Sequence, residues 1–73
     1  MRVLIVDDHR IVASGCRALF ADDPEIDILE ASDAESGERV FGEQHPDICV
    51  LDINLPTVSG FELARRILDR DAL

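Results

Sequence analysis

Short apolar runs alternate along this chain with longer segments in which apolar residues recur at helical spacing. The runs are rich in β-branched residues and bounded by polar ones, a pattern typical of buried strands in a parallel sheet. Strands are therefore predicted at about residues 2–7, 26–31 and 47–52. The remaining segments predict helices at about residues 9–21, 33–44 and 59–70. Strands that alternate with helices of this length favour right-handed βαβ crossovers, and hence an α/β fold with one parallel sheet.

Capping residues mark the starts of two of these helices. Ser32 and Glu35 have the S-x-x-E spacing of a capping box and are predicted to open the second helix. Ser59 and Glu62 repeat that spacing before the third helix. Phe61 follows on what we interpret as the apolar, core-facing side of the third helix.

Acidic residues stand directly after two of the predicted strands. The apolar run 3–6 leads into Asp7 and Asp8, and the run 48–51 leads into Asp52. In open parallel sheets the ligand crevice lies at the carboxyl ends of the strands. If the two strands are neighbours, the three carboxylates converge on one small volume. Because three clustered negative charges repel one another, the arrangement indicates a bound metal ion.

The charge and length of the chain exclude several classes of function. Its 73 residues suffice for one small domain, and the formal net charge is −9 with no basic cluster. Such a chain is repelled by phosphate backbones and anionic lipids, so no direct contact with nucleic acid or membrane is expected. No secretory signal is visible, and Cys16 and Cys49 lack metal-ligand spacing. We therefore expect a cytoplasmic protein with two reduced core thiols.

The order of elements stops before the sheet has a closing strand. The predicted strand 47–52 is almost wholly apolar, and no further strand follows it. An apolar edge with unpaired backbone groups favours pairing with another strand. We therefore expect residues 1–73 to be the N-terminal part of a larger domain. By itself, such a chain is expected to be unstable or to associate through strand pairing, for instance as a homodimer.

A family resemblance rests on these strand-end residues. Asp7-Asp8 after the first strand, Asp52 ending the third, and the stretch 51–56 followed by Ser59-Gly60 resemble the receiver domain of bacterial two-component response regulators. The resemblance runs over the whole chain. It implies a flavodoxin-like (CheY-like), doubly wound parallel sheet, of which the first three βα units are present with strand order 2-1-3. Strands four and five and any output domain would then be absent.

The resemblance also implies a role for each strand-end residue. Asp52 would be the phosphoacceptor, a carboxylate nucleophile that receives its phosphoryl group from the phosphohistidine of a sensor histidine kinase. Asp8 and Asp52 would hold Mg²⁺ directly, with the backbone carbonyl of Asn54 as a third ligand and Asp7 acting through water. The protein would thus accept a phosphoryl group on itself rather than act as an enzyme. Asp7-Asp8-His9-Arg10 further resembles the subfamily with a LuxR-type helix-turn-helix output domain, which implies control of transcription.

The same residues were also considered for two other functions and for a second role of His9. The receiver family places a hydroxyl residue after strand four and a lysine after strand five, and this chain has neither strand and no lysine. A degenerate or truncated receiver that acts as a non-phosphorylated interaction module is therefore the alternative. A haloacid-dehalogenase-like phosphatase needs a second acid two residues after the nucleophile, and Asp52-Ile53-Asn54 lacks it. His9 could be a metal ligand or phosphodonor, but we interpret it as a solvated residue in the first turn of a helix.

Overall fold

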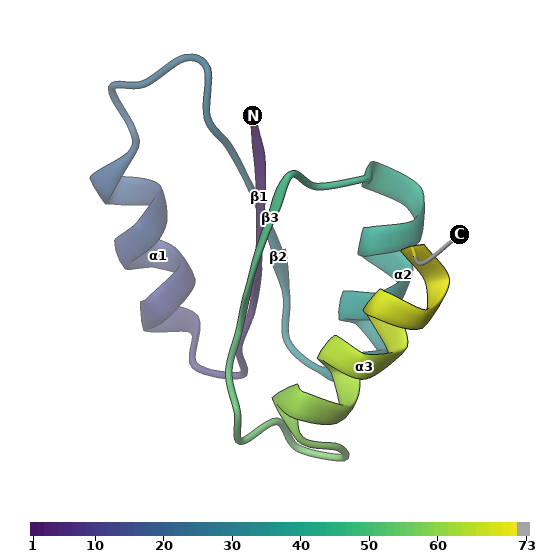
Figure 1. The fold of residues 1–73 in the computed structure, drawn as a ribbon. Coiled ribbons are helices and arrows are strands. Elements are labelled where there is room, and N and C mark those ends of the chain that lie inside the picture. The colour runs from purple at the N-terminus through teal and green to yellow at the C-terminus, as the bar shows by residue number, and fades with distance from the viewer. Residues whose placement is uncertain (72–73) are drawn as a thin grey trace.

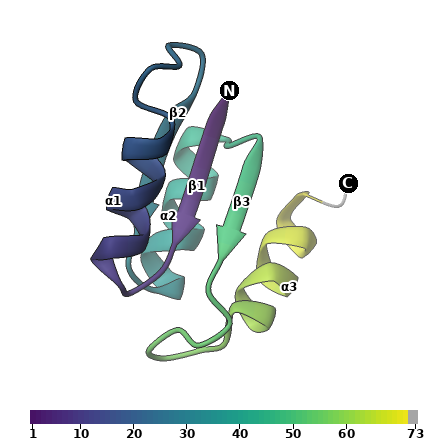
Figure 2. The same ribbon diagram turned by 90° about the vertical axis from the view of Figure 1, so that its left-hand side faces the viewer.

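Strands and helices alternate along the chain, as the sequence pattern predicts. The computed structural model describes residues 1–71. Its elements are β1 (Arg2–Val6), α1 (Arg10–Leu19), β2 (Asp27–Ala31), α2 (Ala34–Gln44), β3 (Ile48–Leu51) and α3 (Gly60–Asp71). All strand pairs are parallel, and the order is β2-β1-β3 (Figures 1 and 2). The predicted α/β class and the strand order 2-1-3 are therefore confirmed.

Helices cover both faces of the sheet. Figure 1 shows α1 on one side of the strands and α2 with α3 on the other. The central strand β1 is buried on both faces because its side chains alternate between them. Leu4 and Val6 belong to the core beneath α2 and α3, whereas Val3 and Ile5 contact Ala13 of α1. None of the helices described over residues 1–71 has the length and apolar character needed to cross a bilayer.

The third strand is less buried than predicted. Ile48 and Val50 are 45% and 48% exposed. The strand register places Ile48 opposite Val3 and Val50 opposite Ile5, on the face that α1 covers. α1 packs against β2, so the part of this face over β3 is left open. The apolar edge expected from the sequence is thus present, but the strand is half-buried because it has a neighbour on one side only.

The capping box of α2 lies one residue later than predicted. The side chain of Asp33 accepts a hydrogen bond from Ser36 N at 2.8 Å, and Ser36 Oγ accepts one from Asp33 N at 3.3 Å. Asp33, not Ser32, is therefore the N-cap. Aspartate is at least as good an N-cap as serine, and here serine at the third helical position completes the reciprocal pair in place of Glu35.

The predicted N-cap of α3 is confirmed in part. Ser59 Oγ accepts a hydrogen bond from the backbone N–H of Glu62 at 3.2 Å. The Glu62 carboxylate does not complete the box, because it binds Arg65 at 2.7 and 3.0 Å instead. The first helix is also shorter than predicted: α1 ends at Leu19, and residues 20–22 form a turn.

The predicted core position of Phe61 is wrong. Phe61 is 70% exposed, whereas Leu63 and Ile67 are 0% and 8% exposed and lie in the core. Leu63 and Ile67 are four residues apart and share one face of the helix. Two positions along a helix turn a side chain by about 200°, so Phe61 points away when Leu63 points inward.

Candidate functional site

The site lies at the carboxyl ends of β1 and β3, where backbone hydrogen bonds continue past the strands. Asp7 N donates to Ala31 O at 3.0 Å, and Asp52 N donates to Val6 O at 2.9 Å. Val6 pairs with Leu51 across the two strands, so the residues that follow them are neighbours. Both strands deliver an aspartate to the same edge of the sheet.

Four side chains meet at this edge. Asp7, Asp8, His9 and Asp52 each offer a potential ligand atom, and these atoms lie within 4.8 Å of one another. The convergence of three aspartates that the sequence suggested is therefore observed. The Asp7 and Asp52 side chains are 14% and 18% exposed, and that of Asp8 is 39% exposed. Solvent can thus reach the cluster past Asp8 and His9 but hardly past Asp7 and Asp52.

His9 takes part in this cluster, although the sequence was interpreted otherwise. Its Nδ1 lies 2.8 Å from Asp7 Oδ1, 3.1 Å from Asp8 Oδ1 and 3.7 Å from Asp52 Oδ2. The side chain is 65% exposed, so the prediction of a solvated residue holds for most of the ring but not for Nδ1. The position directly after Asp7-Asp8, at the same strand end, was the signal that could have indicated this contact.

Hydrogen bonding within the cluster shifts two pKa values. The pKa of Asp7 is lowered, chiefly because its carboxylate accepts a hydrogen bond from the backbone N–H of His9 at 2.8 Å. The pKa of His9 is raised, first by the hydrogen bond to Asp7 and then by the charges of Asp8 and Asp7. Burial opposes both shifts without cancelling them. A negative Asp7 beside a protonated His9 is therefore favoured.

The segment after Asp52 is held tightly against it. Asn54 N donates to Asp52 Oδ1 at 3.0 Å, which fixes one carboxylate oxygen. Gly60 N donates to Ile53 O at 2.8 Å and thereby ties the start of α3 to the same segment. Between them, Leu55 is buried in the core. The predicted ligand position of Asn54 thus belongs to a loop that is anchored at both ends.

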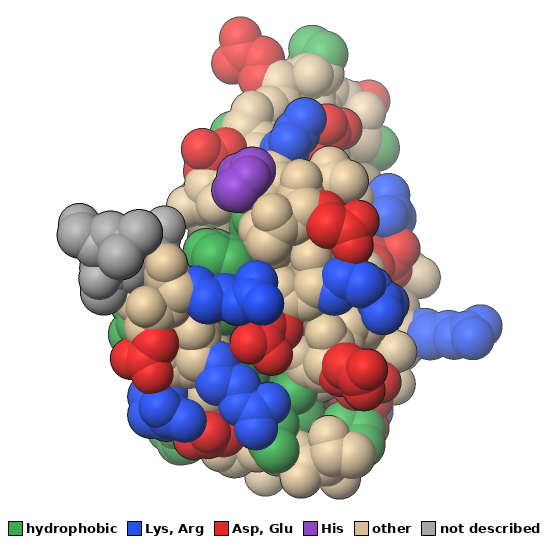
Figure 3. All heavy atoms as spheres, turned by 90° about the vertical axis from the view of Figure 1, so that its right-hand side faces the viewer, with side chains coloured by type: hydrophobic (Ala, Val, Ile, Leu, Met, Phe, Trp, Pro, Cys, Tyr) green, Lys and Arg blue, Asp and Glu red, His purple; other side chains and the backbone are tan. Residues whose placement is uncertain are grey.

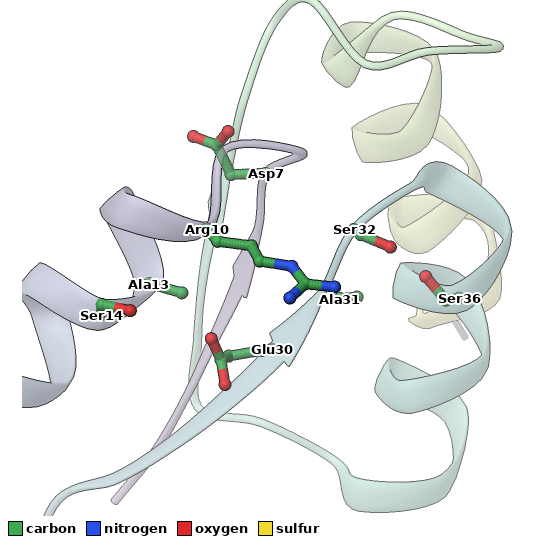
Figure 4. Close-up of a pocket in the computed structure, with 8 residues that line it drawn as sticks. All are labelled: Asp7, Arg10, Ala13, Ser14, Glu30, Ala31, Ser32 and Ser36. Atoms are coloured by element: carbon green, nitrogen blue, oxygen red, sulfur yellow. The ribbon is translucent and has the colours of Figure 1, made fainter.

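A cavity of about 450 Å³ lies beside the cluster, between α1 and the start of α2. Figure 4 shows the side chain of Arg10 extending from α1 toward Ser32 and Ser36. The Glu30 carboxylate on its wall is bound by Arg17 at 2.8 Å. Asp7 lines this cavity but Asp52 does not, so the cavity adjoins the acidic cluster without containing it.

Charges on the face formed by α2 and α3 are interleaved rather than segregated. Figure 3 shows acidic and basic side chains alternating over this side of the molecule. Arg65 contacts both Glu62 and Asp69, and Arg70 contacts Glu38. Because these arginines have carboxylate partners, residues 1–71 form no basic patch of the kind that nucleic-acid binding requires on this face.

Comparisons with known proteins agree on one family. Residues 3–72 match the family model of the response regulator receiver domain. The DNA-binding transcriptional activator DevR/DosR of Mycobacterium tuberculosis is 42% identical over 72 residues, which cover 96% of this chain and 33% of that protein. A LuxR-family two-component response regulator from Aurantimonas sp. has a TM-score of 0.86 and 40% identity, over 97% of this chain and 51% of that chain. The response regulator TrrA from Thermotoga maritima, solved in complex with Mg(2+)-BeF, has a TM-score of 0.86 and 27% identity, over 97% of this chain and 61% of that chain.

These matches cover nearly the whole chain but only part of each relative. The chain spans about a third of the length of the curated transcriptional regulators that it matches and about a fifth of two matched methylesterases. Its three parallel strands and three helices superimpose on the two solved regulators over 97% of this chain. The fold is accordingly the flavodoxin-like (CheY-like) one, and the chain belongs to the response regulator receiver family.

Proposed function

We propose that this chain is the N-terminal part of a receiver domain and that Asp52 accepts a phosphoryl group from the phosphohistidine of a sensor histidine kinase. The observation that carries this proposal is the state of the Asp52 carboxylate. One oxygen, Oδ1, is held by Asn54 N at 3.0 Å, while Oδ2 faces the cluster at 3.7 Å from His9 Nδ1. A carboxylate with one oxygen fixed and the other free at a strand end is oriented for nucleophilic attack.

The transfer exchanges one bond for another at phosphorus. Asp52 Oδ2 attacks the phosphorus of the phosphohistidine, and the P–N bond breaks. The electron pair of that bond returns to the imidazole nitrogen, which takes up a proton from solvent. The product is an aspartyl phosphate on this chain and a free histidine on the kinase, so the chain is a substrate of phosphotransfer rather than an enzyme with a separate substrate.

The cluster has the donor set for Mg²⁺. Its three carboxylates are hard oxygen donors, which this ion prefers. Asp8 and Asp52 would bind the ion directly, the backbone carbonyl of Asn54 would be a third ligand, and Asp7 would act through water. When bound, Mg²⁺ offsets the negative charge that accumulates between the carboxylates and the phosphoryl oxygens. The relative solved with Mg(2+)-BeF supports this choice of ion.

We propose that the protein acts in the cytoplasm and that its output is the control of transcription. Support comes from the matched relatives, which include a DNA-binding transcriptional activator and a LuxR-family regulator. DNA would be contacted by an output domain and not by these residues, in keeping with the net charge of −9. The kinase is the direct partner of this segment, and β3 provides an edge at which a second copy can pair.

A non-phosphorylated interaction module is the second candidate. It is supported by the open edge of β3, where Ile48 and Val50 are 45% and 48% exposed and another strand can pair. The two candidates differ in whether Asp52 is ever modified.

Phosphorylation of the full-length protein that carries this chain separates them. With Mg²⁺ and acetyl phosphate as donor, we expect intact-mass analysis to show the gain of one phosphoryl group, stable in acid and lost in base. Asp52→Asn should abolish this gain, and the matched control Asp47→Asn should keep it. Equal labelling of Asp52→Asn and the wild type would reject Asp52 as acceptor, and no labelling of the wild type would favour the interaction module.

A further inference from the structure

We propose that the cavity between α1 and the start of α2 binds a phosphate group, either as inorganic phosphate or as the phosphate monoester of a small metabolite. This site is separate from the proposed phosphoacceptor, because Asp52 does not line the cavity. Its volume of about 450 Å³ falls in the range of roughly 300–1,000 Å³ that is typical of small-molecule sites. The small side chains of Ala13 and Ala31 in its wall leave this space open between the two helices.

The guanidinium group of Arg10 supplies a positive charge to this cavity. Figure 4 shows it extending from α1 across the cavity toward Ser32 and Ser36. Within residues 1–71 it makes neither a hydrogen bond nor an ion pair, whereas every other arginine contacts a carboxylate or a carbonyl oxygen. A guanidinium can bind the oxygens of a phosphate through two parallel N–H groups. Arg10 is therefore available for an anionic ligand.

The two carboxylates in the cavity wall already have partners. Glu30 is bound by Arg17, at 2.9 Å from Nε and 2.8 Å from Nη2. Asp7 accepts a hydrogen bond from the backbone N–H of His9, and its carboxylate also lies 2.8 Å from the His9 ring. The charge in the wall that has no partner is thus the positive one of Arg10. Because this charge is local, it favours an anion in the cavity even though the chain as a whole is acidic.

Two hydroxyl groups complete the donor set. Ser14 and Ser32 line the cavity, and neither hydroxyl has a hydrogen-bond partner in the described part of the chain. Ser32 is available because Asp33 caps α2 in its place. The guanidinium of Arg10 and the two hydroxyls together offer donors from three side chains. This number matches the three terminal oxygens of a phosphate monoester better than the two oxygens of a carboxylate.

Nuclear magnetic resonance titration of the isotope-labelled 73-residue chain, without Mg²⁺, tests the proposal. Inorganic phosphate and glycerol phosphate are the probes, and glycerol is the control ligand. We expect saturable shifts at the side-chain Nε–H of Arg10 and at the amides of Ser14 and Ser32 with both phosphates, and none with glycerol. The probe that binds more tightly identifies the source of the phosphate group, the free ion or an ester.

Two substitutions and a matched control locate the site. Arg10→Gln keeps a good helix former and removes the charge, so we expect it to weaken phosphate binding roughly tenfold or more. Ser32→Ala should weaken binding by a smaller factor, because it removes one neutral donor. Arg39→Gln is the control, since Arg39 lies outside this cavity and approaches Glu43 only to 4.0 Å. It should bind both phosphates as the wild type does.

The inference is overturned if neither phosphate gives saturable shifts, or if Arg10→Gln binds them as tightly as the wild type. The Asp52→Asn variant distinguishes this inference from the proposed function. Because Asp52 is not part of the cavity, this variant should lose phosphorylation by acetyl phosphate and keep the phosphate-dependent shift at Arg10. Loss of that shift in Asp52→Asn would assign the phosphate to the acidic cluster and reject the cavity as its site.

Discussion

Gly60, the first residue of α3, lies directly against the backbone carbonyl of Asp52. A Cβ built on Gly60 would come within 2.8 Å of the Asp52 carbonyl carbon and closer still to its oxygen. Backbone atoms cannot yield as a flexible side chain can, so this position accepts no side chain without a shift of the segment. The start of α3 and the proposed phosphoacceptor are therefore positioned by one shared contact.

Gly60→Ala is expected to disturb the fold and the site together. Overpacking of this kind costs roughly 1–3 kcal/mol of unfolding free energy, measured by urea denaturation. Gly15→Ala is the matched control, because nothing lies within 4 Å of its Cβ and alanine favours the helix by about 0.5–1 kcal/mol. We also expect Gly60→Ala to weaken Mg²⁺ binding. Unchanged stability and unchanged Mg²⁺ affinity in this variant would show that the contact does not position Asp52.

The core assignment of α3 can be tested by a pair of truncations. Leu63→Ala is expected to lower the unfolding free energy by about 2–5 kcal/mol, because Leu63 is fully buried. Phe61→Ala, at a side chain that is 70% exposed, should change it by less than about 0.5 kcal/mol. Thermal and urea unfolding measure both. A larger loss for Phe61→Ala than for Leu63→Ala would contradict the burial of Leu63 and support the core position predicted for Phe61.

Lowering the pH is expected to reduce the unfolding free energy through protonation of Glu62 in α3. Hydrogen bonds from Arg65 lower the pKa of Glu62 from 4.5 to about 2, with a smaller contribution from Arg66. A carboxylate whose pKa is lowered on folding stabilises the protein above its unfolded pKa, and this contribution is lost as the pH falls through the folded pKa. The stability difference between wild type and Glu62→Gln is therefore expected to be constant above about pH 5.5 and to shrink between pH 4.5 and about 2.

Urea unfolding across this pH range provides the measurement. Glu43→Gln serves as the control, since the nearest approach of Glu43 to Arg39 is 4.0 Å on an exposed face. A difference for Glu62→Gln that grows as the pH falls would contradict the assignment.

The open edge of β3 predicts self-association of the 73-residue chain. We expect its weight-average mass in sedimentation equilibrium to rise with concentration, because Ile48 and Val50 leave apolar surface beside unpaired backbone groups. Val50→Lys should keep the chain monomeric, since an edge lysine opposes strand pairing. Ile11→Lys, at a residue that is 81% exposed on α1, should not. A monomeric wild type with a cooperative unfolding transition would refute this prediction.

The strands and the acidic cluster could be predicted from the sequence because both depend on short stretches of consecutive residues. Apolar runs specify β1 and β3, and the residues that follow them must meet at one edge of a parallel sheet. The exposure of Phe61 in α3 could not be predicted in this way. Periodicity marks an apolar side, but the packing of Leu63 and Ile67 against the sheet decides which side faces inward.

Two further differences arise from competition between neighbouring side chains. Ser32 and Asp33 can both cap α2, and spacing alone does not show which will; the carboxylate of Asp33 does so, with Ser36 as its partner. His9 illustrates the same limit at the site. Its position after two aspartates is visible in the sequence, whereas the approach of Nδ1 to Asp52 depends on where β3 ends relative to β1.

The central position of β1 couples the packing of the core to the geometry of the site. Its residues alternate between the two cores up to Val6, and Asp7 follows without an intervening loop. An insertion or deletion of one residue within this strand would exchange the two faces and turn Asp7 away from Asp52 in the same step. Substitutions can alter the packing or the chemistry separately, but length changes in β1 cannot.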